Sequence, residues 1–129
     1  MSNIKKFRVE HGPSYSHIEL SIDFDFTTKY GKKIYTMQDI IKDMVMFWQS
    51  GEGRLSDNDD NYTDAFLKQL CEECVIISAG LNLSTDGLIE SFISREGWYP
   101  MDGKAGILIT NFCIPNFNIP GDYDISEIS

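Results

Sequence analysis

Residues Ser16–Phe26 read SHIELSIDFDF, in which polar and apolar side chains alternate from His17 to the end of the stretch. A period of two is typical of a β-strand that has one face on a core and the other in water. The alternation puts three acids on the water-facing side: Glu19, Asp23 and Asp25. A shorter alternation covers Phe7–His11, and the turn signal Gly12-Pro13-Ser14 separates the two. We therefore predict an N-terminal β-hairpin within residues 1–35.

The first predicted helix follows a basic loop that contains Lys29, Lys32 and Lys33. Thr36 is a candidate N-cap, and Asp39 stands where it can reach back to the cap. Apolar side chains then recur on one face of a helix: Ile40, Ile41, Met44, Val45 and Trp48. The glycines of Ser50-Gly51-Glu52-Gly53 predict the end of this helix.

Two more helices complete a helical part that spans residues 36–97. From Tyr62 to Leu81, apolar side chains recur every three or four residues, and Gly80 and Asn82 are typical stop residues. Ser84 is a candidate N-cap for a shorter helix that ends at Gly97. We expect the shorter helix to bury Leu88, Phe92 and Ile93.

The last predicted strand occupies residues 104–114 and contains the run Ile107-Leu108-Ile109. Consecutive apolar residues favour burial on both faces, which places this strand in the middle of a sheet. Residues 115–129 form a C-terminal arm with two prolines. The predicted fold is α+β with two layers: a three-stranded antiparallel sheet in β-β-α-α-α-β order with helices packed on one face. Residues 1–129 form a single domain.

The composition narrows the class of protein. Of the 129 residues, 42% are hydrophobic, and 20 acidic against 11 basic side chains give a net charge of −9. This acidic balance argues against direct nucleic-acid binding, which needs clustered lysine and arginine. No apolar run approaches the roughly 20 residues of a membrane span. The three cysteines do not make an even disulfide framework, so we expect a cytoplasmic protein in a reducing compartment.

Two motifs resemble redox or metal sites and are better explained as structure. Cys71-Glu72-Glu73-Cys74 is a CxxC, but it lies in mid-helix rather than at a helix N-terminus, where the thiol pKa would fall. Asp57–Asn61 opens like a calcium loop, yet Tyr62 replaces the required glycine and Lys68 the required glutamate. We expect core cysteines, a solvated loop that caps a helix, and neither a metal nor a cofactor.

The two histidines are a further candidate ligand site. His11 and His17 flank the hairpin turn, and a shifted register would let them share a ligand. Exposure on the polar strand face is the favoured interpretation. The chain has no nucleophile elbow and no phosphate-binding glycine loop, so we assign no catalytic residue.

The candidate partner-binding residues are three acids and two aromatic residues. Neighbouring carboxylates among Glu19, Asp23 and Asp25 would lie about 7 Å apart on one strand face, which fits a basic groove on another protein. The alternative is an ordinary solvated face that favours solubility. Trp98 and Tyr99 in the loop before the last strand are either partner anchors or a lid on the core.

A family resemblance is carried by two separated motifs. Phe47-Trp48-Gln49-Ser50-Gly51 and the later run Arg95–Gly103, followed by Gly106-Ile107, resemble the FW-x-S-G and EGW-P-x-D-G-x-x-GI motifs of small bacterial and phage proteins of unknown function. The similarity runs from about Phe47 to Phe117. Because such proteins tend to occur on mobile elements, the resemblance implies an accessory or anti-defence role, with no activity or catalytic residue to transfer.

Three hypotheses follow. The first is a non-catalytic accessory domain whose acidic surface binds a basic protein partner, without nucleic acid or membrane. The second is a small ligand-binding domain or enzyme with a pocket at the edge of helices and sheet, with Arg54 and Asp102 near its mouth beside the two loop aromatics. The third is a structural unit that self-assembles.

Overall fold

The computed structural model describes residues 3–11, 16–47, 51–58, 61–78, 84–113 and 123–128. These residues begin with four strands: β1 (Ile4–His11), β2 (Ser16–Asp23), β3 (Thr27–Tyr30) and β4 (Lys33–Thr36). Four helices follow: α1 (Met37–Met46), α2 (Gly51–Asp57), α3 (Tyr62–Ser78) and α4 (Thr85–Ile93). The described part of the chain ends with β5 (Ile107–Cys113) and β6 (Tyr123–Ile128).

The main sheet is antiparallel and has the strand order β5-β2-β1-β6. Its centre is the predicted hairpin, in which β1 and β2 pair from Ile4↔Asp23 to His11↔Ser16. The predicted turn Gly12-Pro13-Ser14 lies outside the described residues. The prediction of three strands is wrong because part of the expected C-terminal arm forms β6, which pairs with β1 from Lys6↔Ile128 to His11↔Tyr123. An arm that begins with prolines can still end in a strand once a neighbouring strand edge offers its backbone groups.

The strand β5 lies at an edge of the sheet and not in its middle. It pairs on one side with β2, and the register shifts between Glu19 and Leu20. Ile107 and Ile109 are buried, whereas Leu108 is 37% exposed. Only one face of β5 is therefore buried, and the prediction that both of its faces are buried is wrong.

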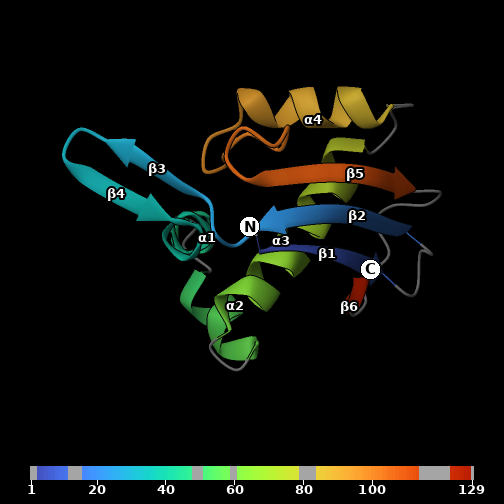
Figure 1. Cartoon of the computed structure of the whole chain (residues 1–129). Helices are drawn as coiled ribbons and strands as arrows, with labels where there is room; N and C mark the ends of the chain where they lie inside the picture. Colours follow the sequence, from blue (N-terminus) through green and yellow to red (C-terminus); the bar gives the residue numbers. More distant parts are fainter. Residues whose placement is uncertain are drawn as a thin grey trace.

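One face of the main sheet is covered by helices, as the α+β prediction requires (Figure 1). Helix α3 contacts β1, β2 and β6, helix α4 contacts β5, and α1 packs on α3. The core between the layers is formed by fully buried side chains from both: Val9, Ile18, Leu20, Ile22, Phe66, Leu70, Leu88 and Phe92 among them. In the described part of the chain, no helix has the length and apolar character needed to cross a bilayer.

Helix α1 begins as predicted. The Thr36 hydroxyl accepts a hydrogen bond from the Asp39 backbone N–H at 3.3 Å, and the Asp39 carboxylate accepts one from the Thr36 backbone N–H at 2.9 Å. The predicted apolar stripe is buried from Ile40 to Val45, and Trp48 lies outside the described residues. The helix ends at Met46, and Gly51 starts α2, so the glycines predicted as a stop in fact open another helix.

The other two helices also begin near their predicted caps. The Asn61 side chain accepts a hydrogen bond from the Asp64 N–H at 3.0 Å, and the Ser84 hydroxyl accepts one from the Gly87 N–H at 3.1 Å. The predicted stop at Gly80 and Asn82 is outside the described residues. Ile93, expected in the core, is 62% exposed, because it falls on the outer face of α4.

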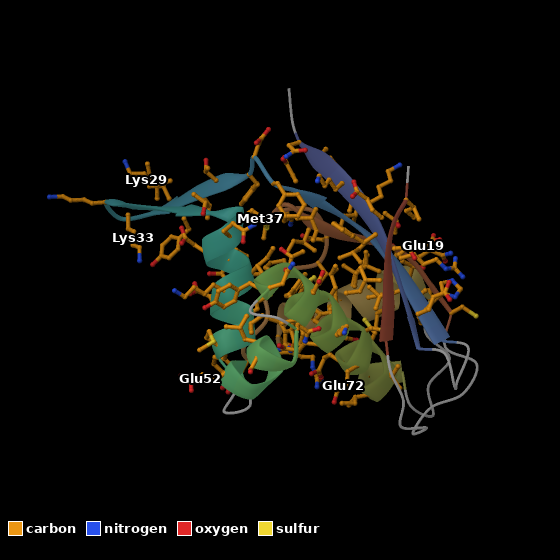
Figure 2. All side chains as sticks on the ribbon, turned by 90° about the horizontal axis from the view of Figure 1, so that it is seen from below. Glu19, Lys29, Lys33, Met37, Glu52 and Glu72 are labelled. Carbon is orange, nitrogen blue, oxygen red and sulfur yellow. The ribbon has the colours of Figure 1, made fainter. Side chains whose placement is uncertain are left out.

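Strands β3 and β4 form a separate two-stranded hairpin, which we call the β3–β4 arm. It leaves the body next to the start of α1 and extends away from the main sheet (Figures 1 and 2). Thr27 pairs with Thr36 and Tyr30 with Lys33, and Gly31 takes a φ of 63° in the turn. The basic loop predicted from the lysines is therefore the tip of an ordered ribbon.

Gly106 carries a backbone constraint just before β5, and replacing it tests that constraint. Its φ is +84°, and an added Cβ would lie 2.8 Å from the Phe26 Cβ and 2.7 Å from the Met37 Cε. We expect Gly106→Ala to lower the free energy of unfolding by about 2–3 kcal/mol, measured by urea unfolding. The control is Gly53→Ala in α2, where an added Cβ meets nothing within 4 Å. There the substitution should raise stability by about 0.5–1 kcal/mol. Equal changes in the free energy of unfolding for the two substitutions would contradict the backbone constraint at Gly106.

The capping box of α1 gives the stability of the protein a pH dependence. Hydrogen bonds from the backbone N–H and then the hydroxyl of Thr36 lower the pKa of Asp39 below its ordinary 3.8. Because the folded pKa lies below the unfolded one, the stabilisation is fully present above pH 3.8 and disappears as the pH falls through the folded pKa. Urea unfolding at a series of pH values measures the free energy of unfolding of wild type and of Asp39→Asn. We expect the wild-type value to be higher by a constant amount above pH 3.8, and the difference to shrink as the pH falls further. A margin that does not change with pH would contradict the assignment.

Candidate docking surface

The face of the main sheet that carries no helix is the candidate docking surface, and we call it the open face. Because paired residues point to the same side of an antiparallel sheet, the register assigns its side chains. From β1 and β2 they are Lys6, Arg8, Glu10, His17, Glu19, Ser21 and Asp23. Leu108 and Cys113 join them from β5, paired with Ser21 and His17. The face is therefore mixed in charge, with lysine and arginine among the acids.

Arg8 holds the centre of the open face. Its Nε donates to Glu10 Oε1 at 2.5 Å, and its Nη1 donates to Glu19 Oε1 at 3.1 Å. The side chains of Arg8, Glu10 and Glu19 are 35%, 47% and 25% exposed, so the cluster is partly shielded from water. These hydrogen bonds, that of Glu10 first, raise the pKa of Arg8. Glu19 thus shares Arg8 with Glu10, and the three side chains together carry one net negative charge.

Asp23 and Asp25 do not continue a row with Glu19. Strand β2 ends at Asp23, whose Oδ1 accepts a hydrogen bond from the Asp25 backbone N–H at 3.0 Å. Asp25 is exposed in the turn that leads to β3. The expected strand over Ser16–Phe26 is therefore too long, because the Asp23 side chain stabilises a turn there. Asp23 and Asp25 form what we call the acidic corner, and no ion pair between described residues uses either carboxylate.

The acidic corner has an apolar neighbour. Ile4, the first residue of β1, pairs with Asp23 and is 55% exposed. Ile4 also lines a shallow hollow of about 560 Å³ at the end of β1 and β6. The other lining residues are Lys5, Lys6, Glu127 and Ile128. The corner thus combines two carboxylates with a water-exposed isoleucine, a composition suited to contact with another protein.

The two aromatic residues predicted as anchors contact the core and α1. Trp98 is 9% exposed and packs edge-on against Phe92, with ring centroids 5.2 Å apart. The Tyr99 hydroxyl donates to Asp43 Oδ2 at 3.1 Å. The ring of Phe47 occupies the space where Gly97 would otherwise hold a Cβ. These contacts favour the lid interpretation for Trp98, and the role of Tyr99 in binding a partner remains a prediction.

The two residues predicted at a pocket mouth, Arg54 and Asp102, belong to different elements. Asp102 accepts a hydrogen bond from the Lys104 backbone N–H at 3.0 Å, and its Oδ2 lies 3.8 Å from Lys104 Nζ. It thus stabilises the turn before β5. Arg54 belongs to α2, and its side chain lies outside the described atoms. The pocket near these residues, and with it the ligand-binding alternative, stays a prediction.

The CxxC motif lies within α3, and part of the calcium-like stretch Asp57–Asn61 lies outside the described residues. Cys71 and Cys74 are buried in α3, where burial raises the pKa of Cys71 to about 12 and that of Cys74 well above its ordinary value. Among the described residues, no three histidine, cysteine or acidic side chains are grouped so that they could bind a metal ion. His17 pairs with Glu10 and His11 with Ser16, so the histidines do not face each other.

Sequence reasoning missed Arg8 as the organising residue of the open face. The signal was present in the two alternating runs. A four-residue loop at 12–15 pairs positions whose numbers sum to 27, which sets Arg8 opposite Glu19 and Ile4 opposite Asp23. Reading the turn as three residues leaves that register open. For the β3–β4 arm, the lysines and the glycine predicted a basic loop, with Ile34-Tyr35 either extending the second strand or starting a short one, and the strand pairing of Thr27–Tyr30 was missed.

Comparison with known proteins reveals relatives of unknown function. A family model described as "Protein of unknown function (DUF2528)" matches residues 18–127, which extends well beyond the resemblance seen between Phe47 and Phe117. "Protein ea10" of Escherichia phage lambda is 32% identical over 116 residues, covering 86% of both chains. "Lambda prophage-derived protein ea10" of Escherichia coli O6:H1 (strain CFT073) matches to the same extent. No solved structure matches the chain significantly.

The cysteines allow a chemical check of the packing. Only a thiolate is alkylated efficiently, and the raised pKa values keep the buried thiols protonated at neutral pH. In the native protein we expect iodoacetamide to modify the exposed Cys113 at least about a hundredfold faster than Cys71 or Cys74, with all three reacting in urea. Peptide mass spectrometry after a timed quench measures each site. Rapid native labelling of Cys74 would show that α3 does not pack on the sheet as described.

Proposed function

We propose that this chain, which belongs to the DUF2528 family of proteins of unknown function, is a non-catalytic accessory domain that binds a basic protein partner. The binding surface is the acidic corner, Asp23 and Asp25, together with the exposed side chain of Ile4. The observation that carries the proposal is that no ion pair between described residues uses either carboxylate, beside an apolar side chain that is 55% exposed.

The open face supports the corner mechanically. The ion pair of Arg8 with Glu19 joins β1 to β2, and the pair of Arg8 with Glu10 lies within β1. Two backbone hydrogen bonds hold the end of β2 at the acidic corner. The Asp23 N–H donates to the Gly106 carbonyl at 2.8 Å, and the Phe24 N–H donates to the Asn3 carbonyl at 3.0 Å. A corner held by three segments is already ordered before binding, which lowers the entropic cost of association.

The charge of the whole chain supports the sign of the partner. The chain carries −9, and residues 26–38 carry +3 with no acid among them, so the remainder carries −12. A surplus of this size attracts a basic protein over distances up to the Debye length, about 8 Å at physiological salt, and raises the association rate. The corner then provides the short-range contacts, in which carboxylates accept charge-assisted hydrogen bonds from lysine or arginine.

The accessory part of the proposal comes from the relatives. One of them is a phage protein and another is described as prophage-derived, which agrees with the mobile-element setting expected from the motifs. We therefore propose that the basic partner is a host or phage protein present during infection or prophage carriage.

Charge reversal at the corner tests the proposal. The immobilised full chain is used to capture proteins from a lysate of phage-carrying host cells, and captured proteins are identified by mass spectrometry at low and high salt. We expect a basic protein whose affinity falls at least about tenfold, or about 1.4 kcal/mol, in Asp23→Lys/Asp25→Lys, measured with the purified partner. Asp23→Asn/Asp25→Asn keeps the turn acceptor and should give a smaller loss.

The matched control is Asp86→Lys/Glu90→Lys, which makes the same change of charge on the exposed side of α4. If the corner is the site, this control loses affinity only through the altered net charge and recovers at moderate salt. Equal losses in both variants would leave general electrostatics as the sole cause and overturn the corner as the site. Capture that resists salt and both reversals would overturn the proposal as a whole.

A further inference from the structure

The β3–β4 arm has an outward face that the body does not cover. Thr27, Lys29, Ile34 and Thr36 point to this side by their register, and all four are exposed. Ile34 is 61% exposed and lies directly opposite Lys29. A two-stranded hairpin is only marginally stable by itself. An isoleucine at the centre of such a ribbon, with lysines around it, therefore gains from a second surface of matching chemistry.

The positive charge of the β3–β4 arm indicates which kind of surface can bind it. Lys29, Lys32 and Lys33 are exposed at and near its tip, and the Nζ of Lys33 lies 4.7 Å from the centre of the Tyr35 ring. Two arms would repel each other if they paired edge to edge, since each carries +3. A nucleic acid would gain at most three phosphate contacts from one arm and would meet the −12 of the rest of the chain. An acidic protein surface with an exposed apolar centre fits both the lysines and Ile34.

Such a surface exists at the other end of α1. Met46 and Phe47 are 36% and 53% exposed there, an unusual pair of large apolar side chains in contact with water. Asp43, one turn before Phe47, and Glu52 in α2 are exposed acids beside them. We call these four residues the α1-end patch. On the same helix, Lys42 is turned toward the ring of Tyr62, with its Nζ 5.9 Å from the ring centre.

We propose that the protein forms a two-fold dimer in which the β3–β4 arm of each copy docks on the α1-end patch of the other. The arm joins α1 at Thr36, the N-cap, and the patch lies at the opposite end of a helix of ten residues, about 15 Å away. The arm itself is four residue pairs long, about 13 Å. Figure 2 shows the arm, marked by Lys29 and Lys33, extending away from Glu52, the labelled residue of its own α1-end patch.

A two-fold axis satisfies both contacts at once. With the two α1 helices antiparallel across the axis, the start of each lies beside the end of the other, so each arm begins next to the α1-end patch of the other copy. Each Ile34 then packs on Met46 and Phe47 of the other copy, while Lys29 on the same face of the ribbon and Lys32 at its tip face Asp43 and Glu52. The same patch is used on both copies, as a closed isologous dimer requires. The acidic corner is not part of this interface, so self-association and partner binding are separate properties.

Sedimentation of the full chain tests the dimer. We expect the mass to be twice the 14.7 kDa of one chain, and Ile34→Asp should halve it. The matched control is Ile93→Asp, because Ile93 is as exposed as Ile34, at 62%, but lies on α4. This control should remain dimeric. Circular dichroism shows whether each variant is folded. A wild type that stays monomeric up to the highest soluble concentration would overturn the proposal, as would loss of the dimer in Ile93→Asp alone.

Charge exchange then assigns the contacting surfaces. Lys29→Glu/Lys32→Glu should be monomeric, and adding Asp43→Lys/Glu52→Lys in the same chain should restore the dimer. Carbodiimide coupling of a mixture of ¹⁴N- and ¹⁵N-labelled chains should join arm lysines to Asp43 or Glu52 between copies. Intermolecular links that involve only Lys5 and Lys6 would place the interface on the main sheet and overturn the arm. Binding of labelled duplex DNA by a monomeric wild type, lost in Lys29→Glu/Lys32→Glu, would instead make the arm a nucleic-acid contact.

Discussion

The structure depends on the one-sided burial of the β1–β2 hairpin. Every second residue of β2, from Ile18 to Ile22, is fully or almost fully removed from water, and the residues between them are not. A one-residue slip in the pairing would exchange the two faces and expose the core, so the register is strongly specified. The helices must cover the apolar side, and the other side of the sheet must be polar. This single constraint produces both the two-layer body and the open face.

The same register determines the electrostatics of the open face. Because Arg8 stands opposite Glu19, a carboxylate that reads as surface charge in the sequence becomes half of an internal ion pair. The acids that remain available are at the corner where β2 ends and the chain turns toward the β3–β4 arm. Opposite charge is concentrated a few residues later, in the arm. The molecule therefore presents a compact acidic body with one basic extension, and these two regions are suited to different contacts.

Much of the fold was predictable from local patterns, and the errors have physical causes. The hairpin, the caps at Thr36 and Ser84, and the stripe from Ile40 to Val45 depend on neighbouring residues, so the sequence reveals them directly. The second half of the predicted C-terminal arm becomes β6 only because β1 offers an unpaired edge. Ile93 and Leu108 read as core residues by composition, but both fall on the outer side of their elements. The candidate site was predicted less well, since the pairing of Arg8 with Glu19 depends on the loop length between two strands.

Local patterning alone determined that the chain is an acidic α+β protein with an amphipathic hairpin, capped helices and cysteines in a helix core. These features follow from side-chain periodicity and from hydrogen bonds that span three or four residues. The tertiary structure alone decided that the sheet has four strands, that Glu19 shares Arg8 with Glu10 while no ion pair between described residues uses Asp23 or Asp25, and that the lysines lie on an extended arm. Those properties arise from pairing between residues far apart in the chain, and a linear pattern specifies such pairing only when the lengths of the intervening loops are known.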